Sequence, residues 1–393
     1  MRQATPLKPG RPPASRQALA PRYARRRLVA LGAVAAVVAV VIVAIAGALS
    51  SGSRPARGGG TAGSGPGSGG AALSSTGSHT TTSRTTATRS PAPVAPFRVG
   101  LGSLSVLEPG GSAGARALPT VIRYPALGDA ARGPARGLAP ARAAGPFPLI
   151  VFSQGYDYPA EGYAGLLRAW ARAGYVVADP TYPDTDPSAP GGPNESDIVN
   201  HPRDLSYVIT RLLAAAQDPS SRLHGLIDPR RIAIAGQSDG GDVTLATAAG
   251  TCCRDHRVKA AVILSGAELA AFGGTYYAAG SPPLLVTQGT GDTINVPGCS
   301  AQLYDGAPAP KYYLDLLAQP GQTGYQAHLS PYTTPGRVRD HVAAVVIAFL
   351  DRYLKGRGAA LTAMRRAGTV PGVMALLSPP SLTGRTTICP GAP

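Results

Sequence analysis

The sequence predicts an α/β domain with a mostly parallel sheet and helices on both of its faces. Short, continuous apolar runs alternate with amphipathic stretches along most of the 393-residue chain. Strands buried on both faces have this composition, and helices between them make the crossovers that parallel strands need. The pattern begins at Phe97, so about 290 residues form one domain.

The elements are expected in the following order. The strands are expected at Phe97–Val106, Leu118–Tyr124, Pro148–Ser153, Tyr175–Ala178, Arg231–Ala235, Val258–Leu264, Leu284–Thr287 and Lys311–Leu317. The helices are expected at Ala160–Ala173, Arg203–Ala216, Gly240–Ala249 and Val338–Leu354. The strands are short apolar runs, and the helix at Ala160–Ala173 is amphipathic.

Positive charge is concentrated before the predicted domain. The chain has 37 Lys and Arg against 21 Asp and Glu, but 12 of those bases and none of the acids precede residue 97. The domain itself is therefore close to neutral. Because the excess positive charge belongs to the N-terminal tail, the high overall charge does not indicate a nucleic-acid-binding protein. The composition also excludes a coiled coil, a collagen and a multi-span membrane protein.

The N-terminal region contains a segment whose sequence predicts that it enters a membrane. A basic tail at 1–27 precedes Leu28–Leu49, which has 22 residues without a charge. A helix of this length spans about 33 Å, close to the thickness of the hydrocarbon core of a bilayer. The basic flank is expected to stay in the cytoplasm, with the rest of the chain outside.

Two fates of this segment stay open. Its length favours an uncleaved signal-anchor, whereas the A-x-A-like sequences Ala44–Ala46 and Ala46–Ala48 favour a cleaved signal peptide. The domain is thus expected outside the cell. It is either attached to the cell membrane through the uncleaved segment or secreted after cleavage. Residues 50–95 are rich in Gly, Ser and Thr and predict a flexible linker.

A candidate nucleophile lies between a predicted strand and a predicted helix. Gly236–Gly240 matches G-x-S-x-G, with Ser238 at its centre. Such a turn projects the serine hydroxyl above the sheet, and small residues two positions away avoid clashes. The same motif occurs at Gly110–Gly114, but Ser112 there lies between two extended segments and is interpreted as part of a turn.

The chain around Ser238 resembles the α/β-hydrolase superfamily. The stretch FPLIVFSQGYDYPAEGYAGLLRAWARAGYVVADPTY at 147–182 looks like the secreted lipase, cutinase, dienelactone-hydrolase and platelet-activating-factor-acetylhydrolase-like group. ALPTVIRYPA at 117–126 is similar to that group's early strand. The resemblance covers roughly residues 97–356 and implies an α/β-hydrolase fold over 97–393, with a minimal lid, and a Ser–Asp–His triad.

The resemblance also assigns the acid and the base. The segment Gln288–Pro297 is similar to the family's H-G-x-x-D-x-x-V-P acid loop, which makes Asp292 the acid. Because the fold orders its triad Ser, Asp, His along the chain, His328 and His341 are the two possible bases. His328 is preferred because it is expected in a loop before the last helix, whereas His341 begins that helix.

The oxyanion hole needs two backbone donors. In this fold they are the residue after the nucleophile, Asp239, and a residue of the loop after the strand ending at Ser153, for which Tyr156 is expected. Gln154 stands where the family usually has His. The Asp239 carboxylate beside the nucleophile is expected to disfavour anionic substrates.

The substrate pocket is expected to have no large lid. Only about 19 residues separate the strand ending at Leu264 from the next one. The Pro-rich loop Pro180–Pro202 is a candidate pocket wall. Tyr156, Tyr158 and Trp170 are candidate lining residues, although core packing is the favoured interpretation for Trp170.

The four cysteines are Cys252, Cys253, Cys299 and Cys389. An even number outside the membrane indicates disulfides, and three connectivities are possible. Cys299–Cys389 is the preferred pair, with Cys252 and Cys253 either joined to each other or reduced. Their spacing does not resemble a zinc site.

Together these features predict an extracytoplasmic serine hydrolase of carboxylic esters that uses no cofactor or metal. Its expected partners are a small-molecule or lipid-like ester and, through the N-terminal helix, a membrane, but no nucleic acid. Two alternatives stay open: an envelope acyltransferase that uses the same triad, and a catalytically silent binding module tethered to the membrane.

Overall fold

The computed structural model describes residues 96–111, 114–277, 279–382 and 389. The chain divides into two units, Met1–Ser90 and Pro91–Pro393, and the described residues all belong to the second unit. The predicted tail, membrane segment and linker at 1–95 lie outside the described residues, as does Ser112. Within the described part of the chain, no helix is long and apolar enough to cross a membrane.

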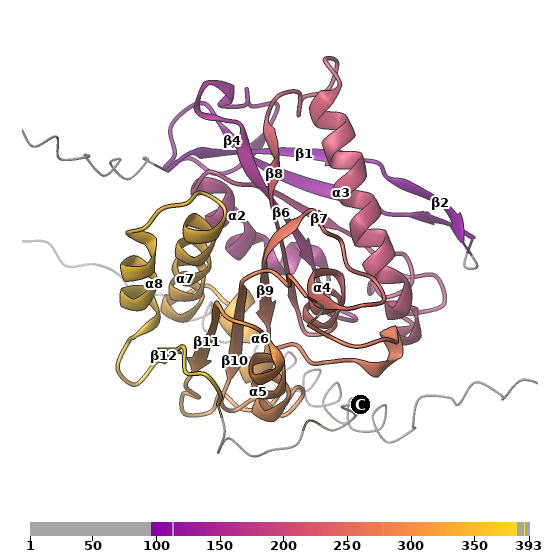
Figure 1. Ribbon diagram of the computed structural model, residues 1–393. Helices are drawn as coiled ribbons and strands as arrows, with labels where there is room; N and C mark the ends of the chain where they lie inside the picture. Colours follow the sequence, from indigo (N-terminus) through magenta and orange to yellow (C-terminus); the bar gives the residue numbers. More distant parts are fainter. Residues whose placement is uncertain (1–95, 112–113, 278, 383–388, 390–393) are drawn as a thin grey trace, which may run out of the picture. The chain divides into compact units, whose positions relative to one another are not determined.

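The fold is α/β, as predicted (Figure 1). The strands are β1 Arg98–Leu104, β2 Leu107–Gly111, β3 Gly114–Ala117, β4 Thr120–Ala126, β5 Ala135–Arg136, β6 Phe147–Ser153, β7 Val176–Pro180, β8 Ile227–Gln237, β9 Val258–Leu264, β10 Leu284–Gly289, β11 Lys311–Leu316 and β12 Met374–Leu377. The α-helices are α2 Ala164–Arg172, α3 His201–Gln217, α4 Asp239–Ala249, α5 Pro297–Gly306, α6 Tyr325–Thr333, α7 Arg337–Tyr353 and α8 Ala360–Gly368. The 3₁₀ helices are η1 Arg142–Ala144, η2 Ala160–Tyr163, η3 Glu195–Asn200 and η4 Ala270–Phe272.

One large sheet organises the described residues. Its ten strands run in the order β12-β11-β10-β9-β8-β6-β7-β4-β1-β5. The run from β11 to β7 is parallel, whereas β12 and the pairs β7–β4 and β4–β1 are antiparallel. Because the central strands are parallel, their carboxyl ends meet at one edge of the sheet, where functional groups gather in open α/β sheets.

Both faces of the sheet are buried. Along β6, Leu149 and Val151 point into one apolar core, and Ile150 and Phe152 point into the other. This alternation follows from the two-residue period of a strand. Helices α3, α4 and α5 pack on the first core, and α2, α6, α7 and α8 pack on the second, so the helices lie on both sides of the sheet in Figure 1.

The structure differs from the predicted elements in several places. The first strand ends at Leu104, and Leu107 begins the separate β2–β3 hairpin. Helices α5, α6 and α8 and strand β12 were not predicted. His328, expected in a loop, lies in α6. Pro331 lies inside the same short helix and removes a backbone donor there, which weakens the local sequence signal for a helix.

Both cysteine pairs form disulfides. Cys299 in α5 is joined to Cys389, as preferred from the sequence, and Cys252 is joined to its neighbour Cys253. The first bond spans a sequence separation of 90 residues and the second a separation of 1. The chain-entropy stabilisation of a disulfide grows with the loop that it closes, so the two bonds differ greatly in expected effect.

Replacing both Cys299 and Cys389 with Ser should lower the free energy of unfolding by about 4 kcal/mol, because the denatured chain regains the freedom of a long loop. Urea unfolding of the full chain without reductant measures this loss. The matched control is the double replacement of Cys252 and Cys253 with Ser, which opens no long loop and should cost far less. Equal losses in the two double variants would contradict the prediction.

Candidate active site

Ser238 occupies a strained turn between a strand and a helix. β8 ends at Gln237 and α4 begins at Asp239, so only Ser238 separates them. Its backbone has φ 55° and ψ −127°, a conformation that costs a non-glycine residue about 1–3 kcal/mol. Ser238 N–H donates to Leu264 O of β9 at 2.9 Å, which ties the turn to the sheet.

The glycines of the motif are required by close backbone contacts. A Cβ atom on Gly236 would overlap the carbonyl oxygen of Gly240, and one on Gly240 would overlap the carbonyl oxygen of Ser153. A Cβ atom on Gly155 would lie 2.8 Å from Gln237 Oε1 and 3.2 Å from Ser238 Cβ. The loop after β6 therefore packs directly against the turn that carries Ser238.

Asp292 and His328 form a buried pair. His328 Nδ1 lies 2.7 Å from Asp292 Oδ2, and the two residues are 3% and 2% exposed. The other oxygen, Asp292 Oδ1, accepts the N–H groups of Ile294 at 2.8 Å and Asn295 at 3.1 Å. Gln288 Nε2 also donates to Oδ2 at 3.1 Å. These donors fix the carboxylate where it follows β10.

The pair determines the tautomer of the histidine. An ionised carboxylate only accepts hydrogen bonds, so Nδ1 of His328 carries the proton and donates it. Nε2 of a neutral imidazole is then a lone-pair acceptor, which is the state that a general base needs. The alternative His341 lies elsewhere, because its Nδ1 is 2.9 Å from Ala367 O. Among the described residues, the structure therefore brings Asp292 to His328 and not to His341.

Both candidate oxyanion donors adjoin the contact between the loop and the turn. Tyr156 follows Gly155, and Asp239 follows Ser238 as the first residue of α4. The Gly155 N–H points to Tyr163 Oη, at 3.4 Å. The loop is held farther along by the Asp157 N–H, which donates to Thr185 O at 3.0 Å.

The Pro-rich segment predicted as a pocket wall contacts this loop. Tyr156 Oη donates to Pro193 O at 2.8 Å. At the base of the same segment, Tyr182 stacks on His201 with ring centroids 3.8 Å apart, and its hydroxyl lies 3.0 Å from Ser153 Oγ. The two hydrogen bonds thus join the segment to the end of β6 and the loop after it, and the stacking holds the two ends of the segment together.

A buried arginine anchors the wall, and sequence reasoning missed it. Arg116 of β3 pairs with Asp197 of η3 at 2.6 Å and with Asp204 of α3 at 2.8 Å. Burial by itself would raise the pKa of Asp197, but hydrogen bonds from His201, Arg116 and Asn200 outweigh it and lower the pKa to about 2. Arg116 lies in a run of Gly and Ala with no local signal of this role.

Two further predicted lining residues contact the core. Trp170 of α2 is fully buried and packs on Phe152 at a centroid distance of 6.0 Å, so it is a core residue. Tyr158 is half-buried, and its ring lies 5.2 Å from that of Tyr163. Tyr163 and Gln288 contact the site residues but were not singled out from the sequence.

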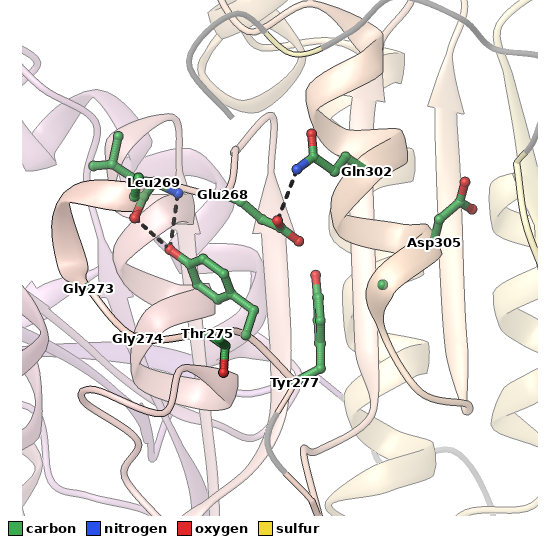
Figure 2. Close-up of a pocket in the computed structure, with 11 residues that line it drawn as sticks. Glu268, Leu269, Gly273, Gly274, Thr275, Tyr277, Gln302 and Asp305 are labelled. Carbon is green, nitrogen blue, oxygen red and sulfur yellow. Dashed lines mark hydrogen bonds between the residues drawn. The ribbon is translucent and has the colours of Figure 1, made fainter. Parts of the chain in front are cut away.

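A pocket of about 640 Å³ lies between the segment after β9 and helix α5 (Figure 2). Its polar groups bond to one another or to nearby backbone. Gln302 Nε2 donates to Glu268 Oε2 at 3.0 Å, and the Tyr276 hydroxyl exchanges hydrogen bonds with the backbone of Leu269. Tyr277 Oη donates to Leu303 O at 2.5 Å. Neither Ser238 nor the Asp292–His328 pair lines this pocket.

Comparisons with known proteins add no relatives: no family model matches the chain, and no curated protein matches it. Among the residues that the structure describes, no group of His, Cys, Asp and Glu side chains could hold a metal ion. The function must therefore be inferred from the geometry around Ser238.

Replacing Gly240 with Ala should disrupt this geometry, because the new methyl group would overlap the backbone of Ser153. We expect a loss of about 1–3 kcal/mol or more in the free energy of unfolding, typical of overpacking. The matched control is Gly358→Ala, where the added atom meets nothing within 4 Å. Denaturant unfolding of the two variants tests this, and equal stabilities would refute the requirement for glycine at 240.

Proposed function

We propose that this domain is a serine hydrolase of carboxylic esters with an α/β-hydrolase fold. One observation carries the proposal. Asp292 lies just after β10 and is paired at 2.7 Å with the buried His328 of α6, and the strained Ser238 follows β8 of the same mostly parallel sheet. A serine becomes a nucleophile when a neutral imidazole accepts its proton and a carboxylate orients that imidazole.

The mechanism begins with attack of Ser238 Oγ on the ester carbonyl carbon while His328 Nε2 accepts the hydroxyl proton. The carbonyl π electrons move to oxygen, and the oxyanion accepts hydrogen bonds from the N–H groups of Asp239 and Tyr156. The position of Asp239 at the start of α4 adds the positive end of the helix dipole. Asp292 stabilises the imidazolium that forms.

The intermediate then collapses. The bond from the carbonyl carbon to the leaving oxygen breaks, and His328 gives its proton to that oxygen, so the alcohol leaves and an acyl-enzyme remains. Water repeats the sequence: His328 removes its proton, the hydroxyl adds to the acyl carbon, and Ser238 departs with the proton. The products are an acid and an alcohol, and the enzyme is restored.

A chain-length series of p-nitrophenyl esters with the full chain tests the proposal. Ser238→Ala and His328→Ala should each lower kcat by roughly 10⁴–10⁶, because triad members act as a unit. Asp292→Asn should lower it by around 10⁴, since the wrong imidazole tautomer is then held. A serine-directed phosphonate should label Ser238.

The control for the base is His341→Ala, which should keep the wild-type rate because His341 bonds to Ala367 and not to Asp292. Full activity of Ser238→Ala would end the hydrolase proposal. Product analysis with added alcohols distinguishes hydrolysis from acyl transfer, because an acyltransferase would form new esters in preference to the free acid.

The side chain of Asp239 gives a second prediction. It is only 8% exposed and adjoins the nucleophile, so its negative charge should repel an anionic acyl group. Asp239→Asn should raise kcat/KM for p-nitrophenyl hemisuccinate relative to p-nitrophenyl butyrate by about tenfold, or ~1.4 kcal/mol. The matched control is Asp218→Asn, which removes the same charge from an exposed side chain. An unchanged ratio in Asp239→Asn would show that this carboxylate does not act on substrate charge.

A further inference from the structure

Two side chains link three segments of the candidate site. Tyr163 Oη accepts the Gly155 N–H at 3.4 Å and donates to Gln237 Oε1 at 2.7 Å. Gln237 Nε2 in turn donates to the backbone carbonyl oxygen of His328 at 3.1 Å. The chain of bonds joins the loop after β6, the residue before Ser238, and the helix that carries His328.

The direction of each bond follows from its chemistry. The carbonyl oxygen of His328 only accepts, so the amide of Gln237 must present its NH₂ group there and its oxygen to Tyr163. The single hydroxyl proton of Tyr163 then goes to Gln237 Oε1, and a lone pair faces Gly155. Burial raises the pKa of Tyr163 well above its usual value, so the phenol keeps this proton throughout the working pH range.

Both side chains are fixed by their surroundings. Tyr163 is 0% exposed and Gln237 is 1% exposed. The Tyr163 ring packs on Phe152 at 4.8 Å and on Tyr158 at 5.2 Å. Because an unpaired polar atom is costly in such a place, the chain of bonds has little freedom to rearrange.

We propose that Tyr163 and Gln237 are positioning residues that hold the backbone of His328 and the Gly155–Tyr156 loop in place around Ser238. They act through the His328 carbonyl and the Gly155 N–H, with no contact to the ester. This inference rests on the proposed ester hydrolysis, since it gives both residues a part in that reaction. A displacement of about 1 Å at reacting groups can cost about 10²-fold in rate.

The test uses Tyr163→Phe and Gln237→Leu in the full chain, with a neutral p-nitrophenyl ester. Each variant should lower kcat by about 10²-fold and leave KM within about twofold. The double variant should lose little more than either single variant, because both break the same chain of bonds. Titration with a serine-directed phosphonate counts the folded, labelled enzyme, so kcat is compared per active site.

The matched control is Tyr175→Phe. Tyr175 is also fully buried, and its hydroxyl donates to Asp351 Oδ1 of α7 at 2.7 Å, so it takes no part in the hydrogen bonds that join Gly155, Gln237 and His328. This variant also loses a buried tyrosine hydroxyl, here one bonded to a carboxylate, and should lose at least comparable stability in urea, but it should keep the wild-type kcat. A purely structural role for Tyr163 would make the two tyrosine variants behave alike.

A second readout does not depend on turnover. The proton that His328 donates from Nδ1 to Asp292 should give a downfield ¹H resonance, assigned by its loss in His328→Ala. We expect this resonance to shift or broaden in Tyr163→Phe and Gln237→Leu and to stay unchanged in Tyr175→Phe. If the wild-type chain hydrolyses no ester, the proposed function fails while the resonance still tests the positioning. The positioning inference is overturned if the resonance is unchanged in both Tyr163→Phe and Gln237→Leu. Where the wild type is active, both variants must also have a kcat within twofold of the wild-type value.

Discussion

The backbone of the loop after β6 lies in direct contact with the turn after β8, and the candidate site depends on this contact. Gly240 leaves no room for a side chain against Ser153, and Gly155 leaves almost none against Gln237. Parallel pairing of β6 with β8 brings the two strand ends together, and the glycines allow the final approach. In the proposed mechanism, this contact allows a backbone donor on the first segment to act beside Ser238 on the second.

The parts of the fold predicted from the sequence are those with a strong local signal. β6, β9, β10 and the part of β8 from Ile232 onward are mostly apolar because both faces of the sheet are covered. Ser238 directly follows β8, and Asp292 lies three residues after the end of β10. α6 has Pro331 inside it, and α5 begins with Pro297 and Gly298, so neither has the pattern of an amphipathic helix. The β2–β3 hairpin is rich in Gly and Ala and lacks the alternation of a half-buried strand. These elements are specified by tertiary packing.

Arg116 illustrates a contact that no local pattern predicts. Its partners Asp197 and Asp204 lie 81 and 88 residues away, and all three side chains are buried. A buried ion pair gains little over an apolar replacement, but removal of one partner leaves an uncompensated charge that costs about 3–5 kcal/mol. The cluster therefore ties η3 and α3 to β3 through one side chain. Its consequence for the site is a fixed wall beside Tyr156.

The disulfide and the orientation of the Asp292 carboxylate are connected through neighbouring contacts. Cys299 is bonded to Cys389, and the next residue, Ser300, donates to Gln288 Oε1 at 2.6 Å. Gln288 Nε2 donates a hydrogen bond to Asp292 Oδ2, the same oxygen that accepts the hydrogen bond from His328 Nδ1. A shift of α5 would therefore move Ser300 and Gln288, and through them the Asp292 carboxylate that is bonded to the imidazole of His328. The disulfide fixes α5 at one end of these contacts, and the Gln237 amide bonds to the backbone of His328 at the other. His328 is therefore constrained at both its ring and its backbone.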